Sequence, residues 1–196
     1  MAKWTFEPGH TAAHFRVRHM MVTWVRGLFG DVHGTLDFDA DEPEKGSVEI
    51  RIDARKIRTG EDARDAHLRH SDFLDVERYP EITFKGCVSE LHGENHFKVT
   101  GPLTLHGISK EVTLDCEHQG AWKTPWWVGD TESGYEDKGP VTRAGFTAEA
   151  RINRFDFGVS WQDTIDRGGV VVGRDLFITI DAEAVLDSDL ERIGEK

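Results

Sequence analysis

The chain has 196 residues, of which 38% are hydrophobic and 31% charged, and these values fit one globular domain. Its 24 lysines and arginines are outnumbered by 36 aspartates and glutamates, so the formal net charge is −12. That charge excludes the broad basic face of a nucleic-acid-binding protein and argues against simple adsorption of the whole molecule to anionic lipid headgroups.

The first residues, MAKWTF, contain neither an apolar run nor a small-residue cleavage site, so no secretory signal is expected. No later stretch approaches the ~18 consecutive apolar residues of a membrane-spanning helix. A cytoplasmic location follows as an expectation. In that reducing compartment, Cys87 and Cys116 are expected to be free thiols.

Apolar and polar residues alternate in many short segments, and a period of two is typical of strands with one buried face. The alternating segments cover residues 15–18, 35–38, 48–53, 82–84, 97–99, 103–105, 112–114, 146–152 and 178–180. They indicate about eight strands separated by turns, with hairpin turns at Gly93–Asn95 and at Gly107. Antiparallel strands in this number can close and leave no exposed edge, so we predict an all-β fold with a closed antiparallel barrel.

Three segments break the alternation. The composition of Glu61–Leu74 favours a helix, which we interpret as a short lid after the third strand. The stretch from Lys123 to Thr142 is rich in Gly, Pro and acidic residues, and a loop of this length is typically functional or mobile. The third segment is the charged stretch at residues 188–196, which is expected to be a frayed tail. The single predicted domain covers residues 1–187.

The barrel interior has two interpretations. The six tryptophans and eleven phenylalanines could line a ligand cavity, because apolar pockets bind chains by area and shape. The same side chains could fill a solid core, and periodicity alone favours the solid core.

The polar residues predict no catalytic or metal site. His10 and His14, and His67 and His70, are spaced like ligand pairs on a helix, but the first pair is in an extended segment and the second has no third ligand nearby in sequence. The adjacent Arg64 and Asp65 are expected to form a structural ion pair that fixes the lid. There is no nucleophile elbow, phosphate loop or dinucleotide fingerprint.

Five separated segments occur in an order that resembles the YceI family of lipocalin-like β-barrels. They are TFEPGHTAAHFRVRHMM, RGLFGDVHGTLDFD, RTGEDARDAHLRHSDFLDVERYPEITF, TGPLTLHGISKEVTLD, and NRFDFGVSW followed by GGVVVGRDLFITIDAE. The third segment is the most specific, and the resemblance covers nearly all of residues 4–185. His14 and His70 depart from the family pattern, and the Trp126–Gly139 region looks like an insertion.

The resemblance implies a non-enzymatic protein that binds, sequesters or transports a long apolar chain in the barrel, such as a polyisoprenoid or an isoprenoid quinone. It also implies a homodimer. No cofactor is expected, and the net charge and the histidine positions argue against a nucleic-acid partner and a metal. The candidate lining residues are Phe15, Val17, Met20, Trp24, Phe73, Phe84, Leu103, Phe146, Trp161 and Ile178. The candidates near a polar headgroup are Arg64, His67 and His19.

Two alternatives stay open. One is an enzyme acting on an apolar substrate, with His67, Asp65 and His19 converging in the cavity. The other is an assembly module with a filled barrel and an exposed apolar patch around Trp126. Trp126 and Trp127 fit three roles equally: a tip for transient membrane contact, a cap on the core, or a dimer contact.

Overall fold

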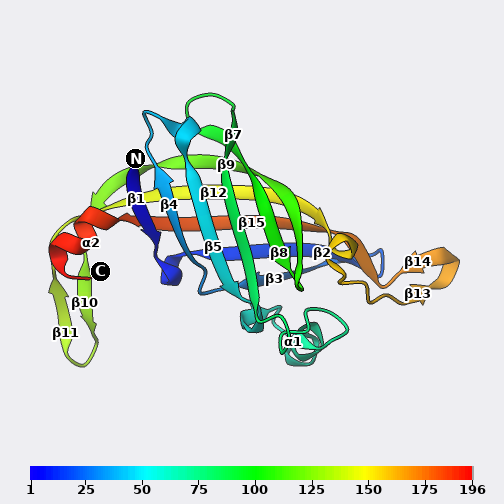
Figure 1. The fold of residues 1–196 in the computed structure, drawn as a ribbon. Coiled ribbons are helices and arrows are strands. Elements are labelled where there is room, and N and C mark those ends of the chain that lie inside the picture. The colour runs from blue at the N-terminus through cyan, green and yellow to red at the C-terminus, as the bar shows by residue number, and fades with distance from the viewer. Residues whose placement is uncertain (196) are drawn as a thin grey trace.

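The computed structural model describes residues 1–195, and strands dominate it (Figure 1). The strands are β1 Ala2–Phe6, β2 Ala12–His19, β3 Thr23–Phe29, β4 His33–Phe38, β5 Ser47–Asp53, β6 Ile57–Arg58, β7 Glu81–Leu91, β8 His96–Leu105, β9 Ile108–Thr124, β10 Trp127–Asp130, β11 Gly134–Asp137, β12 Val141–Asn153, β13 Thr164–Ile165, β14 Gly169–Val170 and β15 Val172–Leu186. The α-helices are α1 Asp62–Arg69 and α2 Asp187–Ile193. Short 3-10 turns lie at η1 Pro8–His10, η2 Pro43–Lys45, η3 Ala54–Lys56, η4 Arg154–Phe157 and η5 Asp166–Gly168.

A closed ring of antiparallel strands forms the barrel. Its order is β1, β4, β5, β7, β8, β9, β12 and β15, and the ring closes because β1 pairs with both β4 and β15. Closure leaves no free edge in the ring. The predicted all-β, lipocalin-like, closed eight-stranded antiparallel barrel is therefore confirmed.

Strand β15 has two partners along one side. Its C-terminal end pairs with β1, where Trp4 lies opposite Leu186, and its N-terminal part pairs with β2, where Ala13 lies opposite Ile180. The chain between β1 and β2 bends through η1, so the two strands are one broken strand along β15. Beyond β2, the sheet continues through β3 to β6.

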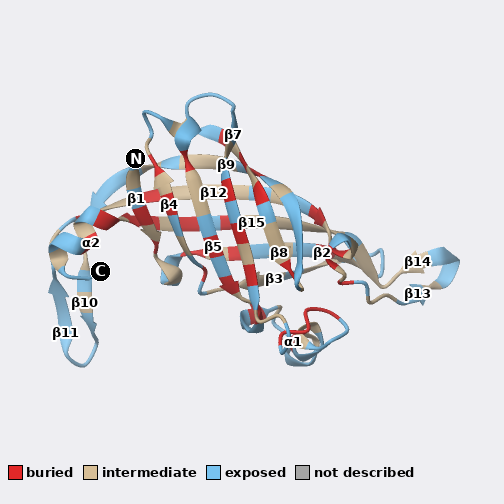
Figure 2. Cartoon of the chain, viewed as in Figure 1, coloured by how far each residue is buried: buried red, intermediate tan, exposed pale blue. Residues whose placement is uncertain are grey.

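The core lies inside the ring. Buried and exposed residues alternate along the strands (Figure 2), as the period of two predicts. In β5, for example, Ile50 and Ile52 are buried while Glu49 and Arg51 face outward. Space inside is tight at Gly27, where an added Cβ would lie 2.4 Å from Cζ of Phe15.

Both predicted hairpin turns are present. Residues 92–95 connect β7 to β8, and His106 and Gly107 alone connect β8 to β9. These two residues have φ values of 52° and 72°, as a two-residue hairpin turn with primed geometry requires. An added Cβ on Gly107 would also lie 2.3 Å from Cε1 of Tyr79. Both the positive φ and this close approach therefore require glycine at position 107.

The lid helix is shorter than the predicted segment. Helix α1 begins after Glu61, whose carboxylate accepts hydrogen bonds from the backbone N–H groups of Ala63 and Arg64. It ends at Arg69, and residues 70–79 continue as turns that bury Phe73, Leu74 and Val76. Figure 1 shows α1 beneath one end of the barrel.

Two regions differ from the expectation of irregular chain. Within Lys123–Thr142, β10 and β11 pair as a hairpin that projects from the ring. The residues expected to form a frayed tail instead include α2, because Leu190 packs in a small cluster with Val141 and Val185. Within the described chain, neither helix is long and apolar enough to cross a bilayer.

Candidate ligand-binding site

The barrel encloses an apolar cavity of about 160 Å³, here called the main cavity. It extends from the middle of the ring to the α1 end, where Leu68, Phe73 and Leu74 close it. Its other lining residues are Ala13, His14, Phe15, Val17, Phe29, Ile50, Ile52, Ile57, Ile82, Thr83, Phe84, Leu103, Leu105, Val112, Leu114, Ala150, Ile152, Arg154, Val159, Val172, Leu176, Ile178 and Ile180. Nearly all of these side chains are aliphatic or aromatic, so the cavity suits an apolar ligand and not water.

A second cavity of about 70 Å³ lies beyond the main cavity along the barrel. Along β5, Val48 faces the second cavity, Ile50 faces both, and Ile52 faces the main cavity. The same order occurs in β9 and in β15, through Cys116, Leu114 and Val112, and through Ala182, Ile180 and Ile178. The two cavities therefore lie in series, separated by a partition of Ile50, Leu114 and Ile180.

Several predicted lining residues come together in these cavities. Phe15, Val17, Phe73, Phe84, Leu103 and Ile178 line the main cavity. Phe146 lines the second cavity, where its ring centroid lies 5.1 Å from that of Phe38.

Other predicted lining residues lie elsewhere. Met20 lies in the turn between β2 and β3, where its φ is 47° and its side chain is exposed. Trp24 packs edge-on against Phe177, with the guanidinium groups of Arg16 and Arg18 over its ring. Trp161 packs against Phe73 behind the cavity wall, with ring centroids 5.2 Å apart.

The predicted headgroup residues are held by local contacts. Arg64 donates from Nε to Oγ1 of Thr59 at 2.7 Å, and Asp65 accepts from the N–H of Thr59 at 2.8 Å. The pair thus fixes α1 through Thr59 and not through a direct ion pair. His67 lies 3.1 Å from Asp72 and stacks edge-on with Phe73, whereas His19 ends β2 opposite Val172. These contacts do not join His67, Asp65 and His19 into one cluster, which is what the enzyme alternative required.

Arg154 is a lining residue that the sequence did not single out as part of the site. It is 2% exposed, and its guanidinium donates to the carbonyls of Val159, Val172 and Gly173 at 2.6, 3.2 and 2.9 Å. Burial lowers its pKa to about 10, which leaves it charged at neutral pH. No salt bridge within residues 1–195 includes it.

Cys116 lines the second cavity as a protonated thiol. Burial raises its pKa to about 12, with a smaller contribution from the negative charge of Asp115. Since the thiolate is the reactive form, this cysteine is inert near neutral pH and acts as a small apolar side chain.

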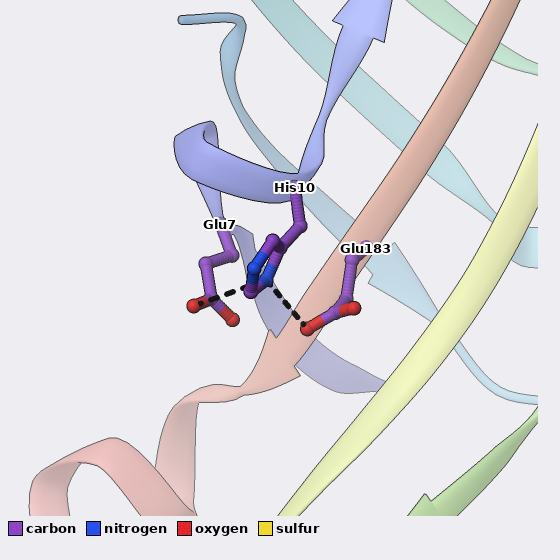
Figure 3. Close-up of side chains that lie close together, drawn as sticks. All are labelled: Glu7, His10 and Glu183. Carbon is purple, nitrogen blue, oxygen red and sulfur yellow. Dashed lines mark hydrogen bonds and ion pairs between the residues drawn. The ribbon is translucent and has the colours of Figure 1, made fainter. Parts of the chain in front are cut away.

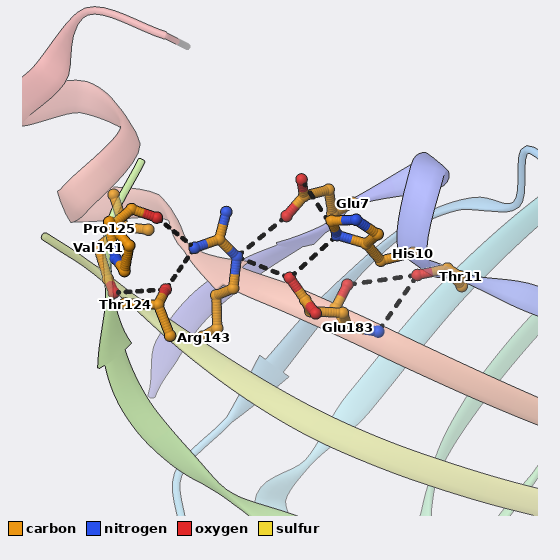
Figure 4. A network of polar contacts seen from close by, with 8 residues as sticks. All are labelled: Glu7, His10, Thr11, Thr124, Pro125, Val141, Arg143 and Glu183. Carbon is orange, nitrogen blue, oxygen red and sulfur yellow. Dashed lines mark hydrogen bonds and ion pairs between the residues drawn. The ribbon is translucent and has the colours of Figure 1, made fainter. Parts of the chain in front are cut away.

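The cluster of Glu7, His10 and Glu183 lies on the outside of the barrel, at the break between β1 and β2 (Figure 3). One ligand atom from each residue falls within 4.8 Å of the others, a spacing that could hold a metal ion. Figure 4 shows that Arg143 already supplies positive charge, since its Nε lies 3.1 Å from Glu7 and 2.6 Å from Glu183. The hydroxyl of Thr11 donates to the carbonyl of Glu183 and accepts from its N–H. The network therefore stabilises the bend between β1 and β2.

Comparison with known proteins gives one consistent family. The model of the YceI-like domain matches residues 4–184. Protein YceI of Salmonella newport is 33% identical over 175 residues, which cover 89% of this chain and 82% of that protein. Burkholderia cenocepacia BcnA superposes with a TM-score of 0.69 at 20% identity, covering 91% of this chain and 98% of that one. A polyisoprenoid binding domain from Saccharophagus degradans superposes with a TM-score of 0.64 at 13% identity, covering 95% and 99%.

Proposed function

The chain belongs to the YceI-like family, and we propose that it binds one long isoprenoid chain inside the barrel and sequesters or transports it. The single observation that carries this proposal is the main cavity, which is apolar, lies inside the ring and is followed in series by the second cavity. A chain that enters gains roughly 25 cal/mol for each Å² of apolar surface removed from water. The rigid ring around the cavity limits the cost of ordering the ligand.

Polyprenyl chains and isoprenoid quinones are the ligands that this proposal names. Both are long, apolar and built from methyl-branched units that match walls of isoleucine, leucine and phenylalanine. Phe15, Val17, Phe84 and Ile178 are proposed to contact the chain directly. We assign the protein no catalytic step, since Cys116 is protonated and His67, Asp65 and His19 are not joined.

Native mass spectrometry of freshly purified protein, followed by organic extraction, tests the proposal. We expect a stoichiometric isoprenoid that leaves the protein on extraction and rebinds when it is added back. The same spectra report whether the protein is the homodimer that we include in the proposal. An empty protein that takes up neither added polyprenols nor added quinones would overturn the binding function.

A further inference from the structure

Two hairpins that carry exposed apolar side chains lie at opposite ends of the molecule (Figure 1). One is the β10–β11 hairpin, which carries the exposed Trp127 and Tyr135. The other is the turn between β2 and β3, where Met20, Met21 and Val22 are 44%, 52% and 79% exposed. Consecutive apolar residues at an exposed turn indicate a contact surface.

The β2–β3 turn is part of a larger projection that we call the docking platform, comprising residues 16–26 and 163–174. The N–H of Met20 donates to the carbonyl of Val171 at 2.7 Å, which joins the turn to the β13–β14 hairpin. Arg18 donates from Nη2 to the carbonyl of Met21 at 3.1 Å and holds the turn itself. These two hydrogen bonds hold the turn with its apolar residues in a defined position.

The docking platform concentrates arginines that have no acidic partner. Arg16 and Arg26 lie directly opposite each other across β2 and β3, an arrangement of like charges that costs stability. None of the salt bridges found in residues 1–195 includes a platform arginine, although the chain has an excess of acids. The platform arginines are Arg16, Arg18, Arg26, Arg167 and Arg174. Its acidic residues are only Asp163 and Asp166.

The β10–β11 hairpin has the opposite charge. Its acidic residues are Asp130, Glu132, Glu136 and Asp137, and its cation Lys138 is paired with Glu136 at 2.7 Å. An anionic lipid surface would repel this hairpin and attract the docking platform. The β10–β11 hairpin and the β2–β3 turn both expose apolar side chains, but only the β2–β3 turn lies among cationic residues.

The docking platform also borders the main cavity. Val17 in β2 and Val172 in β15 lie within the platform and line the cavity as well. The proposed bilayer contact therefore lies beside the wall of the main cavity.

We propose that the docking platform binds the surface of a bilayer that contains anionic lipids, with Met20, Met21 and Val22 in the headgroup region and the unpaired arginines on lipid phosphates. The proposal rests on the isoprenoid-binding function, for which it supplies the site of loading or release. Apolar side chains and cations on one interfacial surface reinforce each other in this way.

Flotation with vesicles tests the docking platform. The wild-type protein is expected to float with vesicles of phosphatidylcholine and phosphatidylglycerol, to float poorly with phosphatidylcholine alone, and to detach as salt is raised. The Arg167→Gln/Arg174→Gln variant should bind about fivefold more weakly for each arginine removed. The Met20→Ser/Met21→Ser/Val22→Ser variant should lose about tenfold or more.

Matched controls distinguish docking through the platform from general adsorption of exposed apolar side chains. Trp127→Ser/Tyr135→Ser removes exposed apolar area from the acidic hairpin and should float like the wild type. All variants should keep the wild-type circular dichroism spectrum and bind farnesol in solution. Wild-type protein that binds farnesol but no anionic vesicle would overturn the docking proposal alone. Vesicle binding without any isoprenoid uptake would support docking and overturn the proposed function.

Three other results would also overturn docking. The first is an equal loss of flotation in the Trp127→Ser/Tyr135→Ser control. The second is release from vesicles by inorganic phosphate but not by chloride at equal ionic strength, which would indicate a site for free phosphate. The third is dissociation of a dimer by the triple serine variant while neither protein floats, which would make the platform an interface between two copies.

Discussion

Arg154 shows at the scale of one residue how the fold tolerates a buried cation. A buried charge without a counter-charge is costly unless hydrogen bonds replace its hydration. Here three backbone carbonyls do so, from Val159 on one side of the β13–β14 hairpin and from Val172 and Gly173 on the other. Arg154 therefore ties together the two ends of the segment that forms part of the docking platform and borders the main cavity.

Replacing Arg154 with methionine should destabilise the protein. Methionine fills similar volume but leaves the carbonyls of Val159 and Gly173 without the donor that Arg154 supplies, whereas the carbonyl of Val172 still accepts from Nε2 of Gln162 at 2.6 Å. Two unsatisfied buried carbonyls should cost about 2 kcal/mol in total. Urea unfolding followed by circular dichroism measures the change. Arg174→Met, at an exposed neighbouring position, should leave the free energy of unfolding within about 0.5 kcal/mol of the wild type. Equal effects of the two substitutions would contradict the tying role of Arg154.

At the scale of elements, α2 is held by a side chain from its own first turn. The carboxylate of Asp189 accepts from the N–H and from Oγ1 of Thr142 in β12, each at 2.8 Å. Burial alone would raise the pKa of Asp189, but the hydrogen bonds from Thr142 and the charge of Arg192 outweigh it and hold the pKa below 3.8. The contact is therefore strongest while the carboxylate is ionised.

The docking of α2 should weaken in acid. Because the folded pKa of Asp189 is below its unfolded value, the stabilisation is fully present above pH 3.8 and is lost as the pH falls through the folded pKa. Hydrogen exchange of the α2 amides, corrected for intrinsic rates, should show protection falling in this range. Asp189→Ala should lack that protection already at pH 7, and the exposed control Ser188→Ala should behave like the wild type. Protection unchanged in Asp189→Ala would exclude the anchor.

Strand prediction worked where one face of a strand is buried. Alternation identified β5, β7, β8, β9, β12 and β15, which carry most of the ring. It missed β3, because residues on both of its faces are partly buried and no period of two appears. It missed β1, which is short, and α2, whose docking depends on a hydrogen bond to Thr142 that no local pattern reports.

The cavity could be predicted only in part for a related reason. Parity along a strand assigned Phe15, Phe84 and Ile178 to the interior, where they lie. Parity does not tell whether an inward side chain faces a void or packs against its neighbours, so Ile50 and Ile180 were not distinguished from solid core. The prediction of Met20 and Trp24 as lining residues does not match the two cavities. Met20 lies in a turn, where side chains do not alternate between two faces, and Trp24 packs under the guanidinium of Arg16.

For the whole molecule, the two cavities in series set how much chain the barrel can hold. Ile50, Leu114 and Ile180 come from strands on different sides of the ring, and each of them lines both cavities. With this partition in place, a ligand in the main cavity ends at these side chains. If the proposed function holds, the partition limits the length of the bound isoprenoid.

Ile180→Ala should open the partition and shift the preference of the protein toward longer isoprenoid alcohols. Removing a buried isoleucine side chain also costs about 2–5 kcal/mol of stability, so a control of equal cost is needed. Ile152→Ala provides it, since Ile152 is buried in the wall of the main cavity but does not face the second cavity. Competition among alcohols of increasing chain length, read by native mass spectrometry, measures the preference. A shift in Ile180→Ala alone assigns the length limit to the partition, whereas the same shift in both variants would mean that added volume anywhere in the barrel is sufficient.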